Sequence, residues 1–356
     1  MQSRIRRTLP TRRSMAGLSL VELMVGITLG LLILAGLASV FANTSRSRTE
    51  LERSSRQIEN GRYAMEILGD DLRTAGFYGE FSVNTLAVPA ALPDPCSTDP
   101  TVWAQAIRVA VQGYDAGASA PTCMPADVQP NTDIIVVRRA AGCEAGVAGC
   151  AAATSQQAFF QAAKCGTQVA ATNTSYILNK NGSTFDRQLK DCATAAGMRR
   201  YFVNIYYIST NNGQGTTIPT LKRLELNDTS DGFNQVALVE GIQQMNLEYG
   251  VDYTGPVACS PDGQPDAWTA DPTSFVPTGC AGSAVINWSN VVAARINILA
   301  RNTEASAGYT DNKTYTLGLD ASGNAVTVTS PNDNYHRHVY NTVVRLVNVS
   351  QRRELP

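Results

Sequence analysis

The sequence has little histidine, no strong charge imbalance and no closely paired cysteines. Only two histidines, His336 and His338, are present in 356 residues, so a catalytic triad has almost no imidazole available. The formal net charge is -1, without the basic excess typical of nucleic-acid-binding proteins. No G-x-x-x-x-G-K-[ST] or G-x-G-x-x-G phosphate loop occurs. We therefore expect no enzyme activity, no catalytic residues, no cofactor and no nucleic-acid partner, and we place both histidines at the surface.

Cysteine is absent from the first 95 residues, and no two cysteines form a C-x-x-C pair. An even number in the polar part of an exported chain favours disulfides. A zinc site is the alternative, but it would need closely spaced thiolates. The connectivity is open, and sequential pairing is the simplest arrangement because it closes short loops. The disulfide candidates are Cys96, Cys123, Cys143, Cys150, Cys165, Cys192, Cys259 and Cys280.

Two acidic segments, 227–232 and 260–266, could offer oxygen ligands to calcium. Neither has the twelve-residue spacing of an EF-hand, and Asp-Gly pairs are common in turns. We predict no metal site, with calcium as the alternative at these segments.

The N-terminus combines a basic leader with a long apolar run. Residues 1–17 carry five arginines and no acid, and residues 18–43 hold a single charge, Glu22. The run is long enough to cross a hydrocarbon core of about 30 Å. A secretory signal peptide would have a shorter apolar run ending in an A-x-A-like site. A plain anchor has no use for Glu22, since a mid-membrane carboxylate costs about 2.5–3.5 kcal/mol.

Cleavage between Gly17 and Leu18 would make Glu22 the fifth residue of the mature chain. The new α-amine, from the same chain or a neighbour, would then be its counter-ion. This pattern resembles the signal of type IV pilins and type II secretion pseudopilins. The resemblance implies cleavage by prepilin peptidase and methylation of Leu18, where these families usually have Phe. Gly26 and Gly30 form a small-x-x-x-small pair suited to close helix packing, although glycine is common in membrane helices generally.

Helical spacing continues beyond the apolar run. An apolar stripe, with charged residues on the other faces, predicts one helix over residues 18–75 whose second half covers a β-sheet; a coiled coil is the alternative. Asp70 and Asp71, with Arg73, are interpreted as a solvated helix face. Gly76 and Gly79 end the pattern. The stripe consists of Ile58, Met65, Leu68 and Leu72, with Tyr63 and Ile67 beside it.

Residues 80–356 are interpreted as a β-rich head domain. Residues 80–130 are interpreted as an irregular connection with one short strand near 106–112. Residues 140–196 form an Ala-rich, Cys-containing insertion that we expect disulfides rather than a core to order. Residues 320–324 are placed in a hairpin turn. Runs of β-branched and aromatic residues predict strands at 134–138, 201–208, 221–226, 235–239, 245–249, 291–299, 314–319, 325–329 and 339–349.

The predicted fold is α+β, with a long N-terminal helix packed on an antiparallel β-sheet and a disulfide-tied, loop-rich insertion. Its parts are a leader (1–17), a transmembrane and assembly helix (18–43), an amphipathic continuation (44–79) and a periplasmic or extracellular head (80–356).

Four segments resemble the PilW family of minor pilins: QIENGRYAMEILGDDLRTAGFYG (57–79), VEGIQQMNLEYGVD (239–252), VVAARINILARN (291–302) and HRHVYNTVVRLVN (336–348). The resemblance implies a minor pilin that primes type IV pilus assembly at or near the pilus tip. It would support pilus biogenesis, adhesion and twitching motility.

The implied partners are other minor pilins, the major pilin, prepilin peptidase, the inner membrane and a tip adhesin. The chain would cross the inner membrane once, with its head in the periplasm, and then join the pilus at the cell surface. One alternative is a J-like type II secretion pseudopilin, which would share the signal and the helix. The other is a membrane-anchored enzyme or ligand-binding domain.

Overall fold

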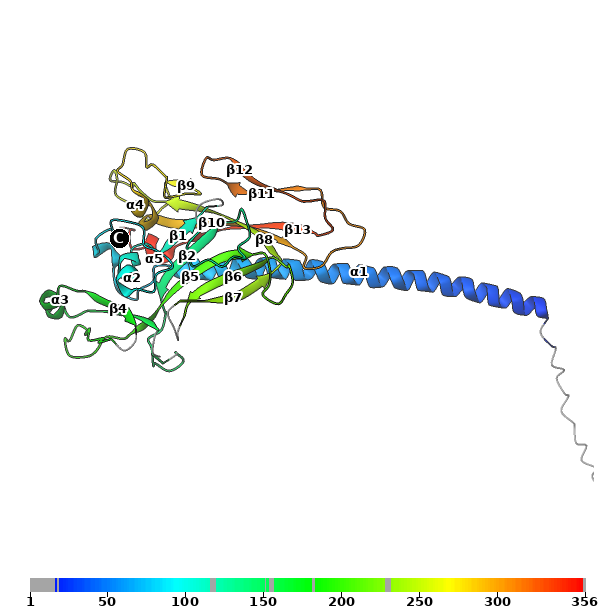
Figure 1. The fold of residues 1–356 in the computed structure, drawn as a ribbon, viewed down its shortest axis with the longest axis horizontal. Coiled ribbons are helices and arrows are strands. Elements are labelled where there is room, and N and C mark those ends of the chain that lie inside the picture. Colours follow the sequence, from blue (N-terminus) through cyan, green and yellow to red (C-terminus); the bar gives the residue numbers. More distant parts are fainter. Residues whose placement is uncertain are drawn as a thin grey trace, which may run out of the picture. The chain divides into compact units, whose positions relative to one another are not determined.

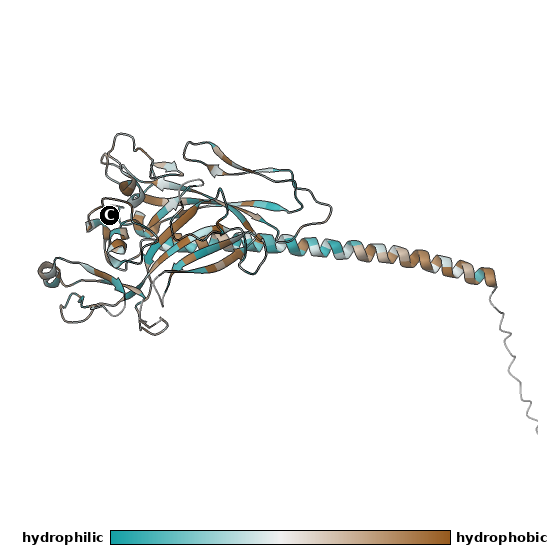
Figure 2. Cartoon of the chain, viewed as in Figure 1, coloured by the Kyte–Doolittle hydropathy of each residue, from teal (hydrophilic) through white to brown (hydrophobic). Residues whose placement is uncertain are grey.

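The computed structural model describes residues 17, 19–115, 120–150, 152–153, 157–180, 183–227 and 232–354. Contacts divide the chain into two compact units, residues 1–52 and residues 53–356. Helix α1 (Leu20–Thr74) belongs to both and agrees with the predicted helix over 18–75. It contains no proline and ends where Gly76 adopts a positive φ of 70°. Figure 2 shows its hydropathy change from apolar to mixed along its length.

All strand pairs among the described residues of the larger unit are antiparallel, in agreement with the predicted α+β fold (Figure 1). A seven-stranded sheet is centred on β5, which pairs with β2, β3 and β6. Its strands are β1 (Val111–Tyr114), β2 (Ile134–Ala140), β3 (Ala158–Ala162), β4 (Tyr176–Lys180), β5 (Arg199–Ser209), β6 (Thr220–Leu226) and β7 (Phe233–Glu240).

A second sheet has the order β13-β10-β8-β9. A separate hairpin joins β11 and β12 through the predicted turn at residues 320–324. The strands are β8 (Ile242–Val251), β9 (Ala267–Thr269), β10 (Val291–Arg301), β11 (Thr314–Leu319), β12 (Ala325–Thr329) and β13 (Arg337–Arg345). The short helices are η1 (Val83–Thr85), α2 (Pro100–Ala106), α3 (Gly166–Thr172), α4 (Ala284–Ser289) and α5 (Val347–Ser350).

Two hydrophobic clusters flank the seven-stranded sheet. The first joins Ala64, Leu68 and Leu72 of α1 to inward-facing residues of both sheets, including Ile135 and Ile296. The second lies on the other face of β2 and β5, where the segment after α1 supplies Tyr78, Phe81, Trp103 and Ile107. Alternation along the strands makes this possible, since successive side chains point to opposite faces. The C-terminal stretch of α1 is therefore core to the head.

The buried face of α1 differs from the predicted apolar stripe. Leu68 and Leu72 are buried as expected, but Ile58 is 41% exposed and Tyr63 is 54% exposed. Small and polar residues face the sheets instead: Gln57, Gly61, Ala64, Gly69 and Asp71 are buried. Small side chains allow the helix backbone to approach the strands closely, which selects this face over the bulkier one.

Three other expectations about the head need correction. The 140–196 insertion contributes β3 and β4 to the main sheet, and Phe160 and Leu178 join a hydrophobic cluster, so a core orders it together with disulfides. Residues 80–130 contain helix α2, capped by Asp99, as well as strand β1, which begins at Val111. The last predicted strand ends at Arg345, and α5 follows it.

Candidate assembly segment and helix anchor

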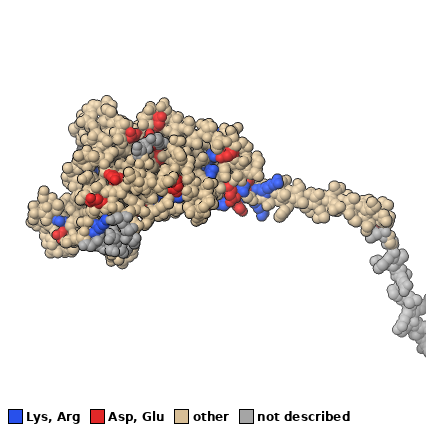
Figure 3. Space-filling model, in the orientation of Figure 1, with Lys and Arg blue, Asp and Glu red and all other residues tan. Residues whose placement is uncertain are grey.

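The apolar half of α1 begins with an ordinary helical turn that contains Glu22. The Leu23 amide donates to the Ser19 carbonyl at 3.1 Å, and Glu22 lies in the first turn, where the helix dipole favours a carboxylate. This helix is long and apolar enough to cross a membrane, and its most apolar stretch has no buried residue. In Figure 3 that half is free of charge on the face in view. Gly17 is exposed, and Leu18 lies outside the described residues.

Gly26 and Gly30 have open surroundings. A Cβ added at either position would meet nothing within 4 Å. No packing within the described part of the chain therefore requires glycine at these two positions. Their role in helix packing stays a prediction about contacts with another helix.

The second half of α1 is joined to the head by polar side chains that reach backbone groups. Buried Gln57 donates through Nε2 to the carbonyls of Ala300 (2.9 Å) and His336 (3.1 Å). Asn60 donates through Nδ2 to the Glu240 carbonyl at 3.1 Å. These bonds connect one helical turn to both sheets.

Gly61 allows one strand to approach the helix closely. A Cβ at this position would lie 2.3 Å from Cε2 of Tyr340 on β13, far inside van der Waals contact. The aromatic ring therefore occupies the space that any other side chain would take. Gly61 is required here by packing rather than by backbone conformation.

Asp71 links α1 to the seven-stranded sheet through three hydrogen bonds. Its side chain is 6% exposed and accepts hydrogen bonds from Arg139 Nε (2.6 Å), Asn204 Nδ2 (2.7 Å) and the Tyr206 hydroxyl (2.8 Å). The interpretation of Asp71 as part of a solvated face is therefore wrong. Asp70 does lie on that face, in an exposed ion pair with Arg73.

A buried arginine stabilises the segment between β10 and β13. The Arg337 guanidinium, 1% exposed, donates to Asp311 at 2.8 Å and to Asp333 at 2.6 Å. These hydrogen bonds from Arg337 hold the pKa of Asp333 below its ordinary value. Periodicity did not reveal this network, because Asp311 and Asp333 lie in irregular segments outside the strands.

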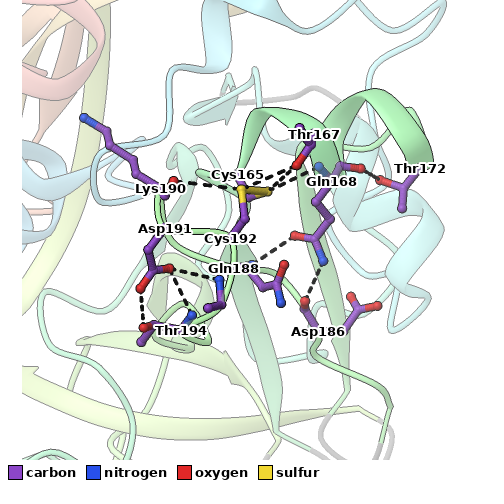
Figure 4. The surroundings of a disulfide bond; sticks show 11 residues. Cys165, Thr167, Gln168, Thr172, Asp186, Gln188, Lys190, Asp191, Cys192 and Thr194 are labelled. Carbon is purple, nitrogen blue, oxygen red and sulfur yellow. Dashed lines mark hydrogen bonds between the residues drawn. A yellow bond between two sulfur atoms is a disulfide. The ribbon is translucent and has the colours of Figure 1, made fainter.

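All eight cysteines form disulfides, and the pairing is sequential: Cys96–Cys123, Cys143–Cys150, Cys165–Cys192 and Cys259–Cys280. Figure 4 shows Cys165–Cys192, which joins the start of α3 to a turn held by Asp191 and Thr194. Gln168 of α3 also donates to the Asp186 carbonyl at 2.7 Å. The predicted disulfides are confirmed, and this one ties down the outer part of the insertion.

The remaining candidate residues show no catalytic or metal arrangement among the described residues. No group of three or more His, Cys, Asp or Glu could hold a metal there. In the 260–266 segment, Asp266 accepts from the Tyr253 and Thr254 amides, which shapes a loop. Part of the other acidic segment, 228–231, lies outside the described residues. His338 is exposed, and His336 is half-buried against the Tyr309 ring.

Together, an exposed apolar helix with one early carboxylate and a helix-anchored antiparallel head define a protein of the α+β class. The sequence model of the family "Type IV Pilus-assembly protein W" (PilW) matches residues 205–348. This match confirms the predicted PilW resemblance and includes three of the four segments that carried it. The chain is thus similar to this family over residues 205–348, which is less than half of its length.

A type IV-like pilin from Thermus thermophilus has a similar solved structure, with 12% sequence identity and a TM-score of 0.35, covering 83% of this chain and 97% of that one. No curated protein sequence matches the chain.

Proposed function

We propose that the chain is a minor pilin that primes type IV pilus assembly and takes a position at or near the pilus tip. The observation that carries the proposal is an apolar helix half that has no buried residue in its most apolar stretch and contains Glu22 in its first turn. Such a surface is stable only in lipid or against other apolar helices. The PilW match favours other pilins as the partners of this surface.

In the proposed cycle, prepilin peptidase cuts after Gly17 and the new amine at Leu18 is methylated. The mature chain crosses the inner membrane once, with its disulfide-bonded head in the periplasm, where disulfides persist. Glu22 pairs with the amine of a neighbouring pilin, and Gly26 and Gly30 allow close helix contacts. The chain then acts as a structural subunit, supporting adhesion and twitching motility through the pilus and a tip adhesin.

The test uses the Glu22→Ala variant in the native host. The variant should still be cleaved, with mass spectrometry finding an N-terminus at methylated Leu18, but should be missing from sheared pili. Glu59→Ala, which removes an exposed carboxylate elsewhere on α1, is the matched control and should be incorporated normally. Normal incorporation of Glu22→Ala would remove the pairing role. An intact Met1 in the wild type would overturn processing.

A J-like secretion pseudopilin remains the second candidate, because it would share the helix and the signal. A deletion strain separates the two. Loss of surface pili with normal protein secretion supports the minor pilin, and co-purification with other pilins identifies its neighbours. Loss of secretion with normal piliation would replace the proposal with the pseudopilin.

A further inference from the structure

A buried lysine, an asparagine and an aspartate meet beside the loop between β5 and β6. Lys222 lies on β6, and its side chain is 2% exposed. Its Nζ atom is 2.8 Å from Oδ2 of Asp127 and 3.2 Å from Oδ1 of Asn211. The Asp127 backbone is fixed next to the end of β5, because the Thr210 amide donates to its carbonyl at 2.8 Å.

The Asp127 carboxylate contacts both ends of the Lys222–Asn211 pair. The same Oδ2 atom that accepts from Lys222 also accepts from Nδ2 of Asn211, at 3.3 Å. Ser209 donates to it at 2.8 Å, and Gln235 at 3.3 Å. The Asp127 carboxylate thus contacts both the Lys222 amine and the Asn211 carboxamide nitrogen. A group that carries a proton from one nitrogen to the other must contact both of them.

The carbon that the Lys222 amine would attack, Cγ of Asn211, also lies near that amine. The Asn211 Cγ carbon is one carbonyl bond, about 1.2 Å, from the oxygen that Lys222 contacts. Asn211 is held in place, since Oδ1 accepts from the Gly213 amide at 2.9 Å and its own amide donates to Ser209 Oγ at 3.2 Å. Attack requires Nζ to approach Cγ to the roughly 3–3.5 Å typical of reacting groups, a short movement of the lysine end from its contact with Oδ1.

We propose that Lys222 and Asn211 form an intramolecular isopeptide bond, with Asp127 as the proton-transfer residue. Asp127 takes a proton from the Lys222 ammonium, and the freed amine attacks Cγ of Asn211. The carboxyl group then moves a proton from the attacking nitrogen to Nδ2. The Nζ–Cγ bond forms, the Cγ–Nδ2 bond breaks and ammonium leaves, so atoms and charge balance without an oxidant or co-reactant.

The held geometry favours this single-turnover reaction, because it makes the attack unimolecular. The Lys222 side chain is 2% exposed, and that of Asp127 is 22% exposed. The product would close the loop between β5 and β6 covalently, at the point where residues 209 and 220 end their ladder. It would add a cross-link that disulfide reduction does not remove.

The test is the intact mass of the full chain purified from membranes, in detergent, after reduction. The mass should be lower than that of the processed sequence by one ammonia. Chymotrypsin cuts after Leu221, so its digest should contain two peptides joined through Asn211 and Lys222. A wild-type chain of full mass overturns the proposal. So does an ammonia deficit without joined peptides, because that result indicates a succinimide at a single asparagine such as Asn212.

Two variants assign the roles. Lys222→Arg keeps a cation beside Asp127 but has no amine for the bond, and Asp127→Asn removes the proton acceptor. Both should show full mass. Lys164→Arg, at an exposed ion pair with Glu80, is the matched control and should keep the deficit. A deficit that persists in Lys222→Arg refutes the assignment, and the wild-type peptide map decides the matter even if a variant fails to fold.

Discussion

Replacing Asp71 by alanine should destabilise the head severely. The substitution leaves three buried or half-buried donors, on Arg139, Asn204 and Tyr206, without their acceptor. Breaking a buried ion pair from one side costs about 3–5 kcal/mol. Arg139 retains 23% exposure, so water recovers part of that cost. We expect a loss of about 2–4 kcal/mol in the free energy of unfolding.

The neighbouring residue supplies a matched control. Asp70 also pairs with an arginine at 2.6 Å, but both side chains are more than half exposed. An exposed pair of this kind contributes at most about 1 kcal/mol. Asp71→Asn keeps the shape of the side chain and one acceptor oxygen. Its loss in the free energy of unfolding should lie between those of Asp71→Ala and Asp70→Ala.

Urea unfolding followed by tryptophan fluorescence measures the difference, because Trp103 and Trp288 are buried in the two hydrophobic clusters. The Asp71→Ala midpoint should move to clearly lower urea than the Asp70→Ala midpoint. Equal midpoints for the two variants would refute the conclusion that Asp71 anchors the helix.

Three other perturbations test different parts of the head. Gly61→Ala should cost about 1–3 kcal/mol by overpacking, and a second substitution, Tyr340→Ala, should recover part of the loss in a thermal melt. Asp333 has a lowered folded-state pKa, so its stabilising contribution is complete above the unfolded value of about 3.9 and disappears as pH falls through the folded value. Acid unfolding of Asp333→Asn should therefore show a shallower pH dependence than the wild type. Cys192→Ser opens a loop with a sequence separation of 27 and should cost about 2–4 kcal/mol, seen as early proteolysis near α3.

The strands of the head were predictable because their side chains carry a local signal. β-branched and aromatic runs located β2, β5, β6, β8 and β10, since a half-buried pleated surface selects those residue types. The disulfide state was also predictable from cysteine number and placement. In the insertion, the signal was limited to Phe159 and Phe160 among alanines and polar residues, so β3 was not recognised.

The helix anchor was not predictable from periodicity. A helical stripe is found by its large apolar residues, which pointed to Ile58 and Tyr63, whereas the buried face carries Gln57 and Gly61. Whether a polar residue on a helix is buried depends on partners far away in sequence. For Asp71 these partners lie more than 60 residues downstream. Lys222 was missed for the same reason, since its partner Asp127 lies 95 residues away.

These missed residues explain why the head tolerates so polar a helix at its centre. Residues 57–71 of α1 hydrogen-bond to backbone or side-chain groups of β2, β5, β7 and β10, and Tyr340 of β13 lies against Gly61. Directional hydrogen bonds to both sheets fix the rotation of the helix about its axis. An apolar stripe alone would leave the helix free to slide against the sheets. A minor pilin of the proposed kind would transmit assembly forces through its N-terminal helix, and a fixed rotation suits that role. The polar anchor therefore serves positioning, and the leucines at 68 and 72 supply the apolar burial.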